Sequence, residues 1–262
     1  MSNPGKRKVV GDEEDDDALR ARMRAEGWHF SSDENRKTVP ATEQVIEAPA
    51  EEVGEELMKA VCQNGALALP KIVSALESDD RVEVQQKAVQ ATAMLAETQG
   101  GRTACLAQGV GALVKVAMTK YLASVDLQAD GCAALSNIAV GDGAKAMVEA
   151  GATNAIVAAM KAQQSSAKVQ IKGCLALGNI AFCNEGEADA IEQGGIEVIL
   201  TALGSHPGSS TLAEEAADAL ANLICGKAGK DVFHAAEGKR VLIAAREKHP
   251  GCASLVELLE SV

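Results

Sequence analysis

Aromatic residues are scarce in this 262-residue chain, which contains one Trp, one Tyr and three Phe although 47% of its residues are hydrophobic. The core must therefore be filled by Ala, Leu, Val and Ile, which suits closely packed helices better than a β-sandwich, where aromatic and β-branched residues prevail. Proline is also rare, because only Pro70, Pro207 and Pro250 occur beyond residue 50, and helices can run freely. These absences predict an all-α fold.

Long apolar runs are absent as well. No stretch of about 18 apolar residues occurs, so we expect no membrane insertion. The opening MSNPGKRKVV passes directly into DEEDDD, without the apolar segment of a secretory signal. Seven Cys in such a chain predict reduced thiols and a cytoplasmic location, with the nucleus as a second compartment. A net charge of −12 predicts no general binding of nucleic acid, because it repels phosphates.

Residues 1–50 differ from the rest of the chain. They contain GDEEDDD and SSDENRK with few aliphatic residues, and we expect a disordered leader with a candidate short basic helix over residues 17–30. That helix ends near Trp28 and Phe30, two of the five aromatic residues. Exposed aromatic side chains are costly unless they anchor to something, so both are predicted docking residues.

Two markers recur at nearly constant spacing after residue 50. Glycines return at steps of 44, 42, 43 and 44, at Gly65, Gly109, Gly151, Gly194 and Gly238. Each follows a short amphipathic run and precedes an aliphatic segment, so each is a predicted helix C-cap in the left-handed conformation. The phrases AALSNIAV, LALGNIAF and DALANLIC follow, and their asparagines, Asn137, Asn179 and Asn222, are 42 and 43 residues apart.

One unit is therefore a short helix, a glycine corner, a second helix and a long third helix. A helical period of 40 to 50 residues indicates a solenoid, in which each unit covers the apolar face of the next. We count five units, at about residues 51–97, 98–140, 141–183, 184–226 and 227–262.

The segments EAGATNAIVAAM and KVQIKGCLALGNIA resemble armadillo repeats, and the resemblance covers about residues 51–262. The family pattern has a Gly-Ala corner, a Val-Gln opening to the third helix and Ala-Leu-x-Asn-Ile-Ala near its end. Val84-Gln85, Leu127-Gln128 and Val169-Gln170 supply the opening, whereas Leu212-Ala213 departs from it. The resemblance implies a right-handed α-α superhelix of about five three-helix repeats. HEAT repeats are the nearest alternative, but they pair two helices and lack the asparagine phrase.

Positions four and seven residues before each asparagine, or before its equivalent Met94, share one helical face. Its polar members are Lys87, Gln90, Asp130, Lys172, Glu215 and Asp218. In armadillo proteins the third helices line a concave groove, and the resemblance implies that Asn137, Asn179 and Asn222 hold the backbone of an extended peptide there. An amide offers both donors and an acceptor for this task. The alternative is that each asparagine bonds neighbouring backbone and stabilises the superhelix, and one residue can do both.

The groove departs from that of importin-α, the nuclear-import adaptor of this family, which places Trp four residues before the asparagine. Here those positions hold Gln90, Ala133, Leu175 and Asp218. The lysine-binding slots that such a Trp array forms are therefore missing. The long basic groove of β-catenin is not reproduced either. Charge changes from Lys87 and Lys172 to Glu215 and Asp218 along the face, which favours a partner with one acidic and one basic end.

No catalytic, metal or cofactor site is predicted. Cys132 and Cys174 occupy equivalent positions where other repeats have Val89 and Ala217, which indicates a small core position. The glycine-rich GDGAK and GKAGK lack the strand and spacing of a phosphate loop. We therefore expect a non-catalytic scaffold or adaptor that binds a protein segment in the groove. The alternatives are a nuclear transport adaptor, or a regulatory subunit that binds through its end or convex faces.

Overall fold

The computed structural model describes residues 48–262, and within this range all regular structure is helical. The predicted leader helix at residues 17–30 and the predicted docking residues Trp28 and Phe30 lie outside the described residues. Helix α2 begins at Ala50, where the helical sequence pattern also begins.

The helices follow one another in groups of three. The first helices are α2 (Ala50–Asn64), α5 (Gln99–Ala107), α8 (Gly143–Glu149), α11 (Asn184–Glu192) and α14 (Lys227–Ala235). The second helices are α3 (Leu69–Ser78), preceded by the 3-10 helix η1 (Gly65–Ala68), and α6 (Val110–Lys120), α9 (Ala152–Ala162), α12 (Gly195–Ser205) and α15 (Gly238–Lys248). The third helices are α4 (Val82–Leu95), α7 (Val125–Ile138), α10 (Ala167–Ile180), α13 (Ser210–Leu223) and α16 (Ala253–Ser261).

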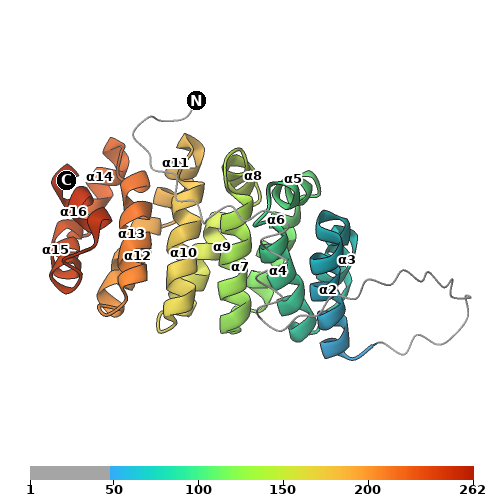
Figure 1. The fold of residues 1–262 in the computed structure, drawn as a ribbon. Helices are drawn as coiled ribbons and strands as arrows, with labels where there is room; N and C mark the ends of the chain where they lie inside the picture. Colours follow the sequence, from blue (N-terminus) through green and yellow to red (C-terminus); the bar gives the residue numbers. More distant parts are fainter. Residues whose placement is uncertain (1–47) are drawn as a thin grey trace, which may run out of the picture.

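Equivalent helices of successive groups pack against each other. The third helices form one row in the order α4, α7, α10, α13 and α16, and the second helices form a parallel row from α3 to α15 (Figure 1). Four of the first helices, α5, α8, α11 and α14, lie at one end of these rows, whereas α2 packs against α4 at the start of the third-helix row (Figure 1). This arrangement confirms the predicted all-α, right-handed superhelix.

The glycine corners differ from the prediction at the first and last repeats. Gly65 ends α2 with a positive φ of 51°, but its ψ of −128° lies outside the left-handed helical conformation. Gly109, Gly151 and Gly194 have φ of 62°, 70° and 84° and join first to second helices in the left-handed conformation, as expected. In the last repeat Glu237 takes this conformation instead, with φ of 54°, and the expectation for Gly238 was wrong. Gly238 begins α15 and needs to be glycine for another reason, because a Cβ there would lie 2.2 Å from the Phe233 ring.

A serine precedes three of the third helices. The hydroxyls of Ser124, Ser166 and Ser209 accept hydrogen bonds from the backbone N–H three residues later, at 3.4, 3.4 and 3.2 Å. A side-chain acceptor of this kind satisfies one of the four N–H groups that a helix start leaves without a partner. The start of each of these third helices is therefore fixed by its own sequence.

The glutamine of the Val-Gln opening ties the third helix to the second helix of the same repeat. Gln128 Nε2 donates to the Met118 and Tyr121 carbonyls at 2.9 and 3.0 Å, where the second helix ends. Gln85 and Gln170 make the same type of contact in their own repeats, and all three side chains are buried. Ala213 occupies this position in the fourth repeat and cannot donate.

A second glycine series, which the sequence analysis did not use, lies near the start of the first helices. A Cβ on any of its members would lie 1.7–1.9 Å from a carbonyl oxygen near the end of the preceding third helix. Its members are Gly101, Gly143, Gly186 and Gly229. Only a residue without a side chain allows the first helix to approach the preceding third helix so closely.

Candidate functional site on the third helices

The structure places the predicted polar residues along the row of third helices. We call this surface the third-helix face; its residues are Lys87, Gln90, Asp130, Lys172, Glu215 and Asp218, and all are half-buried. They come from α4, α7, α10 and α13, which contact one another in this order (Figure 1). The regular stacking of the repeats is therefore sufficient to bring side chains from different repeats, 40 or more residues apart, into one strip.

The asparagines form a ladder between third helices. Asn137 Nδ2 donates to the Ala93 carbonyl at 2.9 Å, and Asn222 Nδ2 donates to the Gly178 carbonyl at 3.0 Å. Asn179 Nδ2 reaches the Ser136 Oγ at 3.0 Å and its carbonyl at 3.3 Å. The three acceptors occupy equivalent positions, each one residue before the asparagine, or before Met94, of the preceding repeat.

These acceptors are the carbonyls that the preceding helix cannot satisfy. At the end of α10 the Leu177 carbonyl accepts the Ala181 N–H, and the Asn179 carbonyl accepts the Phe182 N–H. The Gly178 carbonyl between them accepts the Asn222 amide. Because the last four carbonyls of a helix lack intrahelical donors, each ladder asparagine acts as a C-terminal cap for the third helix before it.

Burial differs along the ladder. Asn179 and Asn222 are 4% and 0% exposed, whereas Asn137 is half-buried. Of the two open interpretations, hydrogen bonding to neighbouring backbone is present at all three residues. A role in peptide binding stays a prediction, and it would use the second N–H and the oxygen that an amide retains after one donation.

The middle of the face contains a cluster of opposite charges. Lys168 Nζ lies 3.1 Å from Asp126 Oδ1 and 3.6 Å from Asp130 Oδ1. Burial raises the pKa of the Asp130 carboxyl, and Lys168 opposes this shift. At the N-terminal end, Lys87 Nζ donates to Gln90 Oε1 at 3.1 Å.

The C-terminal end of the face is acidic. Burial, together with the neighbouring Asp218 and Glu214, raises the pKa of Glu215 to about 7, while Lys172 opposes the shift. The Oε2 atom of Glu215 is buried and makes no hydrogen bond within the described part of the chain. This carboxyl is therefore half-protonated near neutral pH, and a cationic group brought close to it would favour the ionised form.

The cysteines lie where the sequence placed them. Cys132 and Cys174 are fully buried, and burial raises the pKa of the Cys132 thiol to about 12 and raises that of Cys174 as well. Such thiols are poor nucleophiles, because the reactive form is the thiolate. In residues 48–262 no three or more His, Cys, Asp or Glu side chains are grouped as metal ligands, and no helix is both long and apolar enough to cross a membrane.

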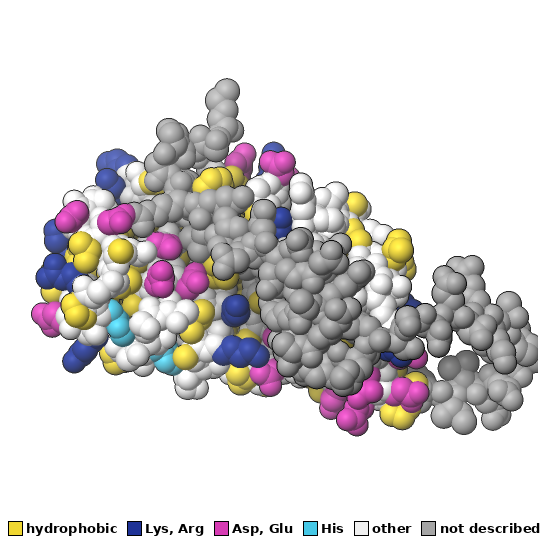
Figure 2. Space-filling view, in the orientation of Figure 1, with side chains coloured by type: hydrophobic (Ala, Val, Ile, Leu, Met, Phe, Trp, Pro, Cys, Tyr) yellow, Lys and Arg dark blue, Asp and Glu magenta, His cyan; other side chains and the backbone are white. Residues whose placement is uncertain are grey.

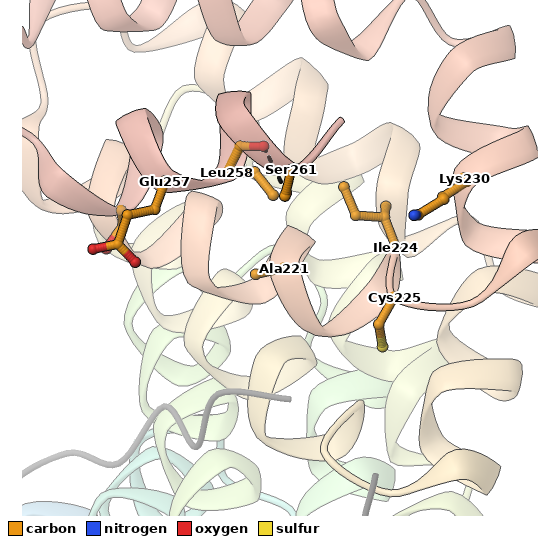
Figure 3. Close-up of a pocket in the computed structure, with 8 residues that line it drawn as sticks. Ala221, Ile224, Cys225, Lys230, Glu257, Leu258 and Ser261 are labelled. Atoms are coloured by element: carbon orange, nitrogen blue, oxygen red, sulfur yellow. Dashed lines mark hydrogen bonds between the residues drawn. The ribbon is translucent and has the colours of Figure 1, made fainter. Parts of the chain in front are cut away.

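A cavity of about 320 Å³ lies between α13, α14 and α16. Ala221, Ile224 and Leu258 line it, and Lys230 and Glu257 stand at its opposite ends (Figure 3). Ala221 is the residue of α13 equivalent to Gly178 of α10, the acceptor of the Asn222 amide. Between α10 and α13, the equivalent position is occupied by the Asn222 side chain, which crosses from one third helix to the preceding one. The cavity therefore lies at the corresponding position between α13 and α16.

Solved structures with similar coordinates identify the architecture. A designed armadillo repeat protein, determined in complex with the peptide (KR)4, superposes with a TM-score of 0.64 over 80% of this chain and 90% of its own, at 22% sequence identity. The chain has an armadillo-like repeat fold. Two crystal structures of engineered proteins match it similarly, with TM-scores of 0.66 and 0.64, identities of 25% and 23%, and coverage of 83% and 81% of this chain and 94% and 91% of theirs.

No protein-family model matches the sequence, and no curated protein matches it. The resemblance noted in the sequence is thus shown at the level of the fold, by structures of about one quarter identity or less. This armadillo-like array differs from an importin-type groove at the positions of Gln90, Ala133, Leu175 and Asp218, none of which is a tryptophan.

Proposed function

We propose that the protein is a non-catalytic scaffold that binds an extended peptide segment of a partner protein along the third-helix face. The observation that carries the proposal is the aligned row of half-buried polar side chains on helices that pack in unbroken order. Half-buried amides, lysines and carboxylates can form hydrogen bonds and ion pairs with the backbone and side chains of a ligand that lies along the surface. The designed armadillo neighbour, whose complex contains (KR)4, supports peptide as the ligand class.

The charges on the face define the direction in which a peptide is bound. Glu214, Glu215 and Asp218 on α13 would receive basic side chains, and Lys87 on α4 would receive an acidic one. The partner segment therefore carries opposite charges at its two ends. Because α4 and α13 are separated by α7 and α10, helix spacings of about 10 Å put these ends roughly 30 Å apart, or about nine extended residues.

Selection of peptides from a random displayed library, with the full chain as bait, tests this proposal. Sequences with a basic cluster and an acidic cluster about nine residues apart are expected to be enriched. The reversal Glu214→Lys, at an exposed position of α13, should weaken the selected peptides about fivefold or more, because one favourable charge pair becomes a repulsive one.

The matched control is Lys161→Glu on α9, an exposed charge reversal in the second-helix row. It should leave peptide affinity unchanged. Peptides that bind both variants equally, or that respond only to Lys161→Glu, would exclude the third-helix face and favour a regulatory subunit that binds through its convex surface.

Asparagine-to-alanine variants are less suited to this test. Each asparagine caps the preceding helix, so its loss changes stability as well as the surface. Charge reversals at exposed positions keep those two effects apart.

A further inference from the structure

A second surface with a distinct chemistry lies in the row of second helices. A cavity of about 320 Å³ separates α12 from α15. Its floor is apolar and is formed by Leu203, Val241, Ala244 and Ala245. Two cations, Arg240 and Lys248, stand on its α15 side.

The equivalent cavity one repeat earlier shows what is particular to this one. Between α9 and α12 a cavity of about 410 Å³ is lined at the equivalent positions by Glu197 and Ser205. The step of 43 residues turns Glu197 into Arg240 and Ser205 into Lys248. The cavity between α9 and α12 is therefore lined by one acid and one lysine, Lys161, whereas the cavity between α12 and α15 is lined by two cations and no acid, so the two cations are not required for the packing of the repeats.

Charge is concentrated on α15 in a way that no other described helix repeats. This helix contains four Lys or Arg and a single Glu, whereas each other helix within residues 48–262 contains at most two Lys or Arg. Lys and Arg side chains gather at the C-terminal end of the molecule (Figure 2). In a chain of net charge −12, this basic surface attracts an acidic ligand while the remainder repels it.

The two cations are available to a ligand. Arg240 Nε lies 2.7 Å from Glu237 Oε2, but both side chains are largely exposed, at 80% and 66%, and such pairs contribute little. Lys248 is exposed and forms no ion pair within the described part of the chain.

We propose that residues 9–17 of this chain, VVGDEEDDD, dock in the cleft between α12 and α15. The segment matches the cleft in both of its properties. Val9 and Val10 supply apolar side chains for the floor, and six consecutive carboxylates follow at residues 12–17, opposite Arg240 and Lys248. No other run of six acidic residues occurs in the sequence.

The chain is long enough for this contact to form within one molecule. Asp17 precedes Ala48, the first described residue, by 31 residues, which span up to about 100 Å when extended. Helices α2 and α15 are four repeat steps apart, or roughly 40 Å at helix spacings of about 10 Å. Tethering gives the segment a high local concentration, which favours docking within one molecule over docking between copies.

Zero-length carbodiimide cross-linking of the full chain tests the proposal, since this reagent joins a carboxylate directly to an amine. An equal mixture of unlabelled and ¹⁵N-labelled chain distinguishes links within a molecule from links between molecules. We expect Lys248 to be linked to residues 12–17 in peptide pairs of like label, with a yield that falls in high salt.

Arg240→Glu should lower the yield of the Lys248 link about fivefold, because it removes one charge pair and adds a repulsion. Lys161→Glu, in the equivalent cavity between α9 and α12, should leave the yield unchanged. The proposal fails if residues 12–17 link to Lys71, Lys115 or Lys161 as efficiently as to Lys248, if the links join unlike labels, or if Arg240→Glu has no effect. Because α12 and α15 belong to the second-helix row, a negative result here leaves the peptide-binding proposal intact.

Discussion

Replacing Asn222 by alanine removes a side-chain donor that reaches the Gly178 carbonyl, at 3.0 Å, from a position that is 0% exposed. A buried polar group that loses its partner destabilises the folded state by about 1–3 kcal/mol. We therefore expect Asn222→Ala to lower the free energy of unfolding by about 2 kcal/mol, with little contribution from lost apolar contact. For a domain of this size the unfolding temperature should fall by roughly 4–8 °C.

A matched substitution separates the capping role from the loss of any amide. Asn154 on α9 donates to Gln193 Oε1 at 3.0 Å, but this hydrogen bond is exposed to solvent. Asn154→Ala deletes the same atoms, and water replaces the lost partner, so the change should stay within about 0.5 kcal/mol. Asn222→Asp should be more harmful than Asn222→Ala, since an ionised carboxylate has no hydrogen to donate to the carbonyl and is costly to bury.

Urea denaturation followed by far-UV circular dichroism measures these differences through the transition midpoint at constant slope. Equal midpoints for Asn222→Ala and Asn154→Ala would refute the capping argument. A lower slope for Asn222→Ala alone would instead show that the repeats on either side of the α10–α13 junction no longer unfold together.

Three other predictions test the structure independently. Gln170→Ala should destabilise the chain by about 1–3 kcal/mol, because the Met160 and Gln163 carbonyls lose their buried hydrogen-bond donor, and Ala213→Gln should stabilise it by about 1 kcal/mol. Equal urea midpoints for the unchanged chain and these two variants would contradict this. Gly100→Ala should be stabilising by about 0.4–1 kcal/mol, because its Cβ meets nothing within 4 Å, whereas Gly101→Ala should be strongly destabilising because its Cβ would lie 1.7 Å from the Leu95 oxygen; thermal melts that rank the two in reverse would refute the packing. Burial holds the pKa of Glu215 at about 7 against an ordinary 4.5, so between these two pH values the folded chain binds more protons than the unfolded chain and loses stability as the pH rises. Glu215→Gln should flatten this fall, and an unchanged profile would show that another group is responsible.

Much of the fold follows from local sequence. The repeat period, the alternation of short and long helices and the αL corners at Gly109, Gly151 and Gly194 were all predicted, and the structure confirms the superhelix they imply. The error at Gly238 has a physical cause. A glycine can be required for backbone conformation or for close packing, and the sequence does not distinguish these two needs; Glu237 tolerates the left-handed conformation, while Gly238 makes room for Phe233.

Sequence reasoning predicted only part of the candidate site. Helical periodicity was enough to place Lys87, Asp130 and Glu215 on one face, because stacked repeats repeat the face. The partner of each asparagine was not, since Asn222 and Gly178 are 44 residues apart and meet only across the α10–α13 interface. The second glycine series had the same period as the first, and its period could have revealed it.

What this sequence determines by itself is therefore the unit: where each helix starts, where it turns, and which side is apolar, because Ser caps, αL glycines and helical periodicity act within a few residues. What only the tertiary structure decides is how one unit completes the next. The free carbonyl at the end of α10 and the amide of Asn222 are each unremarkable in their own helix, and they acquire a function only because stacking brings an unsatisfied acceptor and a donor to within one hydrogen bond of each other.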